Sequence, residues 1–223
     1  MSRERYKKFV GIGLYTVPEA ARLTGAPNAK IMRWLGETKC QAGVVRRDSA
    51  LDHTVSFMEL MELMFIAMFR KEGVSLQTIR RAADAAARQF GTKHPFAARR
   101  FDTDGRDIFI TLSKAECDQQ LVQDLARGQL VFEQIIRPFF RKLEYSSAEA
   151  IRYWPLEPSG RVVLDPSRRF GQPIDSETGV PTDAIIAALS AGGGQDVTEV
   201  ADWLDIPVEA VQAAITFDRS LAS

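Results

Sequence analysis

Three polar side chains lie close together in the sequence and could contact a nucleic acid: Asn28, Lys30 and Arg33. Lysine and arginine form charge-assisted hydrogen bonds with phosphate oxygens, and arginine or asparagine can also bond base edges in the major groove. A helix through this segment would place Lys30 and Arg33 on one side. We therefore predict that these three residues, together with the nearby Arg22, bind DNA.

The charge of the chain is distributed unevenly. The 223 residues carry no formal net charge, yet residues 1–50 hold ten Lys or Arg against four acids, a net of +6. Residues 51–160 hold fifteen of each sign, whereas residues 161–223 hold four basic and ten acidic side chains, a net of −6. A basic segment suits a phosphate-bearing partner, and an acidic one does not. The two ends therefore suit different partners.

A scaffold for the basic residues is predicted over residues 16–35, which have the form of a helix-turn-helix. Thr16 and Glu19 have the spacing of a capping box, so a first helix should begin directly after Thr16 and end before Gly25. A second short helix should open at Pro27. It should bury three apolar residues at helical spacing and leave its basic side chains outward: Ile31, Trp34 and Leu35. The alternative is an ordinary helical hairpin of a soluble domain.

Residues 40–55 follow this pair of helices and resemble a wing. Short β-branched segments flank a polar turn, which is typical of a β-hairpin. Arg46 and Arg47 would lie on it and contact the DNA backbone or the minor groove, where the negative potential favours arginine. The alternative is a surface hairpin whose arginines are solvated.

Two helices are predicted next, over residues 57–69 and from Ser75 to about Phe90. The first contains four of the six methionines and is apolar almost all round, so it should be buried. Glu59 and Glu62 share a face of this helix, and we interpret them as a solvated edge rather than as a pair of catalytic carboxylates.

The middle of the chain is predicted to contain two hairpins and a helix. Asp104-Gly105 supplies the residue pair that a tight turn requires, which favours a hairpin over residues 99–111. Residues 129–145 form an amphipathic helix whose apolar face could be an oligomerisation surface, although burial in the core of the chain is favoured. A second hairpin is predicted over residues 151–164, turning at Ser159-Gly160.

Residues that could support catalysis or hold a cofactor are few. Cys40 and Cys117 are too far apart for a metal-binding pair and too few for a disulfide framework. His53 and His94 have no Cys or Ser partner at a recognisable spacing, and the glycine-rich segments lack the lysine of a phosphate-binding loop. We predict no enzyme, no metal and no cofactor. No apolar stretch approaches the about 20 residues of a membrane span, so we expect a cytoplasmic protein.

The acidic end, from Phe170, is predicted to hold three short helices. They begin near Thr182, Val197 and Pro207, and the last two form a second helix-turn-helix shape. Its second helix offers Glu209 where a DNA reader would place a basic residue, so contact with phosphate is unfavourable. We predict that this part binds a protein or another copy of itself.

Two family resemblances follow from these residues. TVPEAARLTG, the wing and FMELMELMFIAMFRKEGVSLQTIRRA, over about residues 13–90, look like a MerR-type winged helix-turn-helix, although here we expect the chain to continue into β-structure rather than a long coiled coil. DVTEVADWLDIPVEAVQAAITF, with RYWPLE and RRFGQPI, resembles the antitoxins built on the domain of unknown function family 433. That resemblance implies a VapB-type antitoxin paired with a PIN-domain ribonuclease.

The resemblance also implies two partners, operator DNA and a toxin. As an antitoxin, the chain would repress its own operon through the N-terminal half, as a homodimer or within a larger toxin complex. Arginines could plug the acidic metal-binding pocket of the toxin, and the candidates are Arg99, Arg100, Arg168 and Arg169. Alternatively, the acidic C-terminal part could meet a basic RNA-binding rim.

The predicted fold is mainly α with some β. We expect a winged helix-turn-helix domain over residues 1–92, a connecting region over residues 93–168 and a helical domain over residues 169–223. The alternative function is a stand-alone MerR-like transcriptional regulator with a ligand- or protein-sensing C-terminal half.

Overall fold

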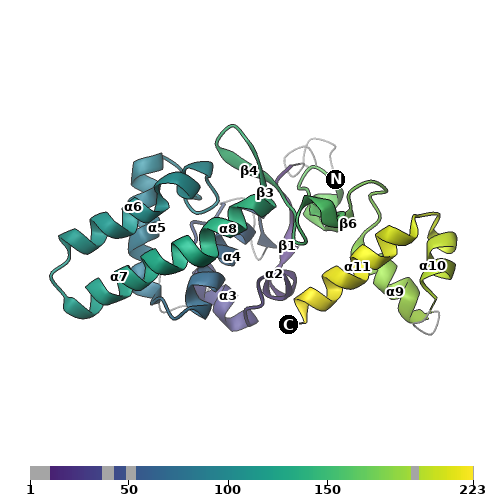
Figure 1. Ribbon diagram of the computed structural model, residues 1–223, viewed down its shortest axis with the longest axis horizontal. Coiled ribbons are helices and arrows are strands. Elements are labelled where there is room, and N and C mark those ends of the chain that lie inside the picture. The colour runs from purple at the N-terminus through teal and green to yellow at the C-terminus, as the bar shows by residue number, and fades with distance from the viewer. Residues whose placement is uncertain (1–10, 37–42, 49–53, 192–195, 223) are drawn as a thin grey trace. The chain divides into compact units, whose positions relative to one another are not determined.

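The computed structural model describes residues 11–36, 43–48, 54–191 and 196–222. These residues are mostly helical and include a two-stranded and a four-stranded sheet (Figure 1), which confirms the predicted fold class. The chain divides into two compact units. The larger unit comprises Tyr15–Arg141 and Tyr145–Ala150, and the smaller unit comprises residues 11–14, Lys142–Glu144 and the chain from Ile151 onward. The predicted boundaries after residues 92 and 168 remain predictions, and each unit runs across one of them.

The first pair of helices in the larger unit lies where predicted. α2 (Val17–Thr24) follows Thr16, whose hydroxyl accepts the N–H of Glu19 while the carboxylate of Glu19 accepts the N–H of Thr16. Gly25 ends this helix with a φ of 67°, a conformation that suits glycine. α3 (Asn28–Leu35) then follows, and both the helix bounds and the capping box are confirmed.

A short two-stranded sheet fixes the entry to these helices. β1 (Tyr15–Thr16) pairs antiparallel with β2 (Thr54–Val55). Each strand leads directly into a helix through a capping box, since Ser56 and Glu59 cap α4 (Phe57–Lys71) as Thr16 and Glu19 cap α2. The starts of α2 and α4 are therefore held side by side.

α4 is the buried helix that its composition predicts. Ten of its fifteen residues are buried, because α2, α5 (Leu76–Phe90) and the helical segment from Phe132 onward all pack against it. The prediction of a solvated edge is wrong, since Glu59 and Glu62 are 0% and 2% exposed. Apolar residues on every face already indicated that no side of this helix meets water.

The predicted hairpin over residues 99–111 is wrong. This segment is a helix, α6 (Arg99–Ala115), and Gly105 lies within it without a positive φ. A Cβ atom at Gly105 would lie 2.5 Å from the ring of Phe132, so the glycine is required for close packing rather than for a turn. Phe101, Ile108 and Phe109 recur at helical spacing on the same buried face.

The chain after α5 therefore continues in helices rather than in the predicted β-structure. α7 (Gln119–Val131) runs beside α6 (Figure 1) and passes without a break into η1 (Phe132–Ile136), α8 (Arg137–Phe139) and η2 (Phe140–Lys142). Its apolar face enters a cluster of aromatic rings in the larger unit, with Phe65 and Phe140 centroids 5.1 Å apart. Burial in the core, the favoured interpretation of this face, is confirmed for Phe132, Ile136 and Phe140.

The four-stranded sheet has the order β3 (Leu143–Ser146), β4 (Glu149–Tyr153), β5 (Val162–Leu164) and β6 (Pro173–Asp175). β4 and β5 are antiparallel, with Tyr153 opposite Leu164, so the two predicted strands are confirmed. Their connection is not a tight turn, because it contains the 3-10 turn η3 (Pro158–Gly160). A second 3-10 turn, η4 (Arg169–Gly171), precedes β6.

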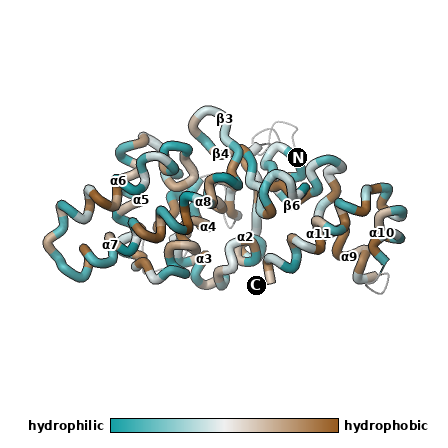
Figure 2. The backbone as a smooth tube through the Cα atoms, viewed as in Figure 1, coloured by the Kyte–Doolittle hydropathy of each residue, from teal (hydrophilic) through white to brown (hydrophobic). Residues whose placement is uncertain are grey.

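The three predicted C-terminal helices are confirmed as α9 (Thr182–Ala191), α10 (Val197–Leu204) and α11 (Val208–Leu221). They share one small core of aliphatic residues that includes Ile185, Val200 and Val211. Most residues of α9 are apolar, and Figure 2 shows this helix in the hydrophobic colour. α9 and α11 also pack against β6, which fastens the three helices to the sheet of the smaller unit.

Candidate nucleic-acid-binding site

α3 separates apolar from polar side chains in the way its sequence predicts. Ile31, Trp34 and Leu35 are at most 3% exposed, and they hold the helix against the rest of the larger unit. Asn28, Lys30 and Arg33 are all exposed. Hydrogen-bond donors thus line the outer face of a helix that is anchored on its other side, which is the geometry required of a helix that enters a major groove.

The turn between the two helices fixes the start of α3. Pro27 precedes the first residue of α3, and its carbonyl accepts the N–H groups of Lys30 and Ile31. Arg22 lies exposed in the last turn of α2, where a cation is favoured by the helix dipole. Arg22 is therefore close in sequence to the basic residues of α3, but it lies on the first helix of the pair.

The loop after α3 is anchored to the end of that helix. The N–H groups of Val44 and Val45 both donate to the carbonyl of Trp34, at 2.8 and 3.1 Å. A Cβ atom at Gly43 would lie 2.7 Å from the backbone of Leu35, so only glycine fits this approach. Within the predicted wing, residues 43–48 contain no strand, and residues 40–42 and 49–53, with Cys40 and His53, lie outside the described residues. The last two residues of the predicted wing, Thr54 and Val55, form β2, which pairs with β1.

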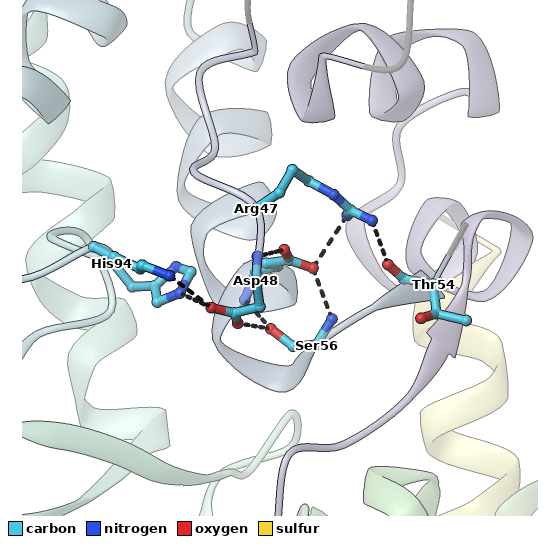
Figure 3. Close-up of polar contacts among 7 residues, drawn as sticks. Arg47, Asp48, Thr54, Ser56 and His94 are labelled. Carbon is cyan, nitrogen blue, oxygen red and sulfur yellow. Dashed lines mark hydrogen bonds and ion pairs between the residues drawn. The ribbon is translucent and has the colours of Figure 1, made fainter. Parts of the chain in front are cut away.

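Arg47 has an internal role in this loop (Figure 3). One guanidinium nitrogen donates to Glu59 at 3.1 Å, and another donates to the carbonyl of Thr54 at 2.7 Å. Glu59 also accepts the N–H groups of Asp48 and Ser56, at 2.7 and 2.9 Å. Because Glu59 is 0% exposed, burial raises the pKa of its carboxyl, and these N–H groups and Arg47 oppose that shift. Arg47 thus fixes the loop to the start of α4.

A second set of contacts completes the same cluster. The hydroxyl of Ser56 donates to Asp48 at 2.9 Å, and Nε2 of His94 lies 3.3 Å from the other oxygen of that carboxylate. Serine, histidine and aspartate meet here, but the serine bonds the aspartate rather than the histidine and is 1% exposed. The arrangement orients a loop and offers no accessible nucleophile. This cluster was not predicted from the sequence, although the spacing of Ser56 and Glu59 is that of a capping box.

Arg46 is placed differently from Arg47. Its guanidinium forms an ion pair with Asp84 of α5 at 3.1 Å, and both side chains are nearly half exposed. Such a pair contributes little to stability because water and salt screen it. The arginine can therefore exchange this partner for a phosphate at small cost.

Glu62 is a second buried carboxylate of α4. One of its oxygens accepts the N–H groups of Phe96 and Ala97, at 2.7 and 3.1 Å. Burial raises the pKa of the Glu62 carboxyl to about 8, against the opposing effect of these two bonds and of Arg46. At neutral pH this carboxyl is therefore mostly protonated in the folded chain.

The four arginines predicted to contact a toxin fall in different units. Arg99 and Arg100 are exposed at the start of α6, where Arg100 pairs with Asp104 at 3.4 Å and lies over the ring of Phe90. Arg168 belongs to the smaller unit, and its guanidinium donates to the carbonyl of Ser176 at 2.8 Å. Arg169 is exposed next to it, with a φ of 47°.

The second helix-turn-helix shape is also present, in α10 and α11. Asp205 takes the position of the left-handed turn residue, with a φ of 52°, and Pro207 precedes α11. Asp202, Glu209 and Gln212 are exposed on these helices, so this corner has the backbone of the first one without its basic face. Trp203 is 71% exposed, a feature of this corner that sequence analysis did not single out.

The described ranges hold no site for a metal ion. Among these residues no three His, Cys, Asp or Glu side chains are grouped as ligands. In the same part of the chain, no helix combines the length and the apolar character needed to cross a membrane.

The fold and this site define a mostly helical α+β protein with two helix-turn-helix corners, of which the first is basic and the second acidic. No model of a known protein family matches the chain, so its predicted membership of the domain of unknown function family 433 and the MerR-like assignment remain predictions. Over 203 residues, 81% of this chain and 84% of the relative, the sequence is 28% identical to the protein named putative antitoxin VapB45 of Mycobacterium tuberculosis (strain ATCC 25618 / H37Rv).

A solved structure resembles this fold. It is the crystal structure of RV2018 from Mycobacterium tuberculosis, with a TM-score of 0.73 and 21% sequence identity. The similarity covers 92% of this chain and 97% of that chain, so it extends over both units. At this identity it establishes the fold alone.

Proposed function

We propose that this protein is the antitoxin of a type II toxin-antitoxin system, that it binds and neutralises a PIN-domain ribonuclease, and that it represses its own operon. The observation that carries the proposal is the similarity to the protein named putative antitoxin VapB45, which extends over 81% of this chain. A protein with these roles acts on DNA and on a cellular ribonuclease, so we place it in the cytoplasm.

The basic corner is the part proposed to bind operator DNA. Asn28, Lys30 and Arg33 are exposed on α3, which gives them access to base edges and phosphates. Arg22 and Arg46 flank them and are assigned to the DNA backbone. We assign Arg47 to positioning, because its guanidinium already bonds Glu59 and Thr54.

A single short recognition helix reads few base pairs, so repression requires two copies. We propose that the protein acts as a homodimer, or within a larger complex with its toxin, on a palindromic operator. The N-terminal basic residues before Gly11, which lie outside the described residues, add to the positive charge of this part of the chain.

The remainder of the chain is proposed to hold the toxin. Arg99, Arg100 and Arg169 are exposed, as an arginine that enters an acidic nuclease pocket must be. Arg168 is partly buried and bonds Ser176, so we assign it to positioning of the loop that carries Arg169. The net charge of −6 over residues 161–223 gives the C-terminal helices a second way to attract a toxin, through a basic RNA-binding rim.

The test uses the full chain and the nuclease encoded beside it. Expression of the nuclease alone should arrest growth, and co-expression of this protein should restore growth and yield a complex that co-purifies. The full chain should also protect the promoter upstream of its own operon in a footprinting experiment. If the protein neither restores growth nor binds the nuclease, it is not an antitoxin, whatever its behaviour on DNA.

A further inference from the structure

α9 and α10 enclose a hollow on the surface of the smaller unit. Its volume is about 330 Å³, and its apolar wall includes Ala188, Leu189, Val200 and Trp203, with Asp196 and Glu199 at the polar side. A hollow of this size accepts an apolar side chain of a partner. Apart from Asp196, which caps α10, these residues lie on two helices that share one core.

Trp203 is the unusual residue of this wall. It is 71% exposed, whereas Val200, one turn before it on α10, is 6% exposed and belongs to the core. A tryptophan left in water forfeits the stabilisation that burial of its large ring would provide. Tryptophan is also one of the residue types enriched among the few positions that contribute most of the energy of a protein interface.

The charge around the hollow restricts the partner. Between Thr182 and Leu221 the chain carries seven acidic residues and one basic residue, Arg219. Asp196, Glu199 and Asp202 lie on the same helix as Trp203 or cap it. Two copies that met through this face would bring like charges together, and a nucleic acid would be repelled. A partner with lysine or arginine around an apolar anchor is attracted.

We propose that the hollow beside Trp203 is the main docking site for the partner protein, and that it takes a segment of that partner in which an apolar side chain is flanked by basic residues. The inference rests on the proposed antitoxin function, since it adds a main docking site for the toxin to the contacts proposed for the exposed arginines. The ring of Trp203 covers the apolar anchor, and the acidic side chains of α10 pair with the basic flanks.

The experiment measures binding of the full-length protein to the purified nuclease encoded beside it. Trp203→Ala should raise the Kd by about 30-fold, the effect expected of an aromatic anchor at the centre of an interface. Glu199→Lys should slow association, most strongly at low salt. Because Trp203 and Glu199 are both exposed, both variants should keep the helical content of the wild type, which circular dichroism checks.

Leu130→Ala is the matched control. Leu130 is an apolar residue of similar exposure, 61%, but it lies on α7 in the larger unit. This variant should bind as the wild type does. A second readout, independent of affinity, is the quenching of Trp203 fluorescence by acrylamide. It is measured as the difference between the wild type and Trp203→Phe, and it should decrease in the complex.

The outcomes separate the two proposals. If the wild-type protein does not bind the nuclease, the proposed function fails and the assignment of the hollow fails with it. If the wild type binds and Trp203→Ala binds equally well, the hollow is not the docking site, while the proposed function stands. If Trp203→Ala alters only the self-association of the protein, a second copy occupies the hollow, and the inference is overturned.

Discussion

The two helix-turn-helix corners of this chain have nearly the same backbone. In each, a capping residue starts a helix of eight residues, a left-handed residue ends it, a buried apolar residue follows, and a proline precedes the second helix. The positions correspond with a constant offset of 180 in residue number, so Thr16 matches Asp196, Gly25 matches Asp205 and Pro27 matches Pro207. The same local rules of capping and turn geometry produced both.

The side chains on the two corners differ in kind. Arg22 corresponds to Asp202, and Lys30 corresponds to Ala210, which is 1% exposed and belongs to the core of the smaller unit. Leu23 is partly buried, whereas its counterpart Trp203 is exposed. A helix-turn-helix backbone therefore does not define a nucleic-acid reader, and the charge and exposure of its outer face determine which partner it suits.

The corners also differ in what supports them. The first packs against α4, whose buried carboxylates Glu59 and Glu62 accept the N–H groups of Asp48 and Phe96, which lie in two different loops. The second rests on a core of aliphatic residues. A scaffold with buried carboxyl groups responds to pH, and one made of aliphatic side chains does not.

The largest expected difference between the two regions is therefore their response to pH. The Glu62 carboxyl has a pKa of about 8 in the folded chain, against an ordinary value of 4.5. Between these values the unfolded chain loses this proton while the folded chain keeps it, so the contribution of Glu62 to stability falls as pH rises and levels off above about pH 8. The total is several kcal/mol, since each unit of pKa corresponds to about 1.4 kcal/mol.

Glu62→Gln should remove this dependence. Its side-chain oxygen can still accept the N–H groups of Phe96 and Ala97, but it carries no ionisable proton. Hydrogen exchange at pH 5.5 and 8.5 should show the larger unit losing more protection in the wild type than in the variant, and the core of α9 to α11 unchanged in both. Parallel losses in the two proteins would show that Glu62 does not titrate in this range.

The elements of both corners could be predicted from the sequence because their signals are local. Capping residues, turn residues and apolar spacing located α2, α3, α10 and α11, and Glu209 on the last helix, where a DNA reader would place a basic residue, indicated that contact with phosphate is unfavourable there. The ion-pair partners of individual charged side chains could not be predicted, because those partners are distant in sequence. Arg46 pairs with Asp84, and Arg47 pairs with Glu59, only after the chain has folded.

Gly105 shows the limit of a local signal. Asp104-Gly105 has the composition of a tight turn, and only the ring of Phe132, 27 residues further on, explains why the glycine lies within a helix. For Trp203 the local signal gave the correct secondary structure but not the exposure of the side chain. Its helical position was predicted, but its exposure depends on how α9, α10 and α11 pack together.

A second prediction tests the difference in outer-face charge. Lys30→Ala with Arg33→Ala should weaken operator binding by about 100-fold at about 0.1 M salt and lower the slope of log affinity against log salt by about two, because two phosphate or base contacts are lost. Glu209→Ala with Gln212→Ala, on the second helix of the other corner, is the matched control and should leave binding unchanged. Footprinting and fluorescence anisotropy over a salt series measure both. An unchanged slope in the first variant would remove α3 from the DNA interface.

The turn residues of the two corners should respond in opposite directions. Gly25 has a φ of 67° and open space where a Cβ would lie, so Gly25→Ala should destabilise the larger unit by about 1 to 2 kcal/mol through backbone strain alone. Asp205 already bears that strain, with a φ of 52°. Asp205→Gly should therefore stabilise the α10 to α11 corner by about 0.5 to 1 kcal/mol, after the greater freedom of glycine in the unfolded chain is deducted. Urea denaturation followed by unit-specific hydrogen exchange measures both, and a loss of stability in Asp205→Gly would show that its side chain stabilises the turn.

The smallest effect concerns the cap of α10 and separates its two roles. Asp196 accepts the N–H groups of Thr198 and Glu199, at 2.8 and 3.1 Å, and its charge lies beside the hollow next to Trp203. Asp196→Ala should cost about 1 kcal/mol, as the loss of an N-cap usually does, whereas Asp196→Asn keeps an oxygen for the cap and should cost only a few tenths. Hydrogen exchange at the first turn of α10 measures this difference. If Asp196→Asn preserves that protection but slows association with the nuclease, the carboxylate acts on the partner; if both variants lose protection equally, the charge of the cap is what holds the helix.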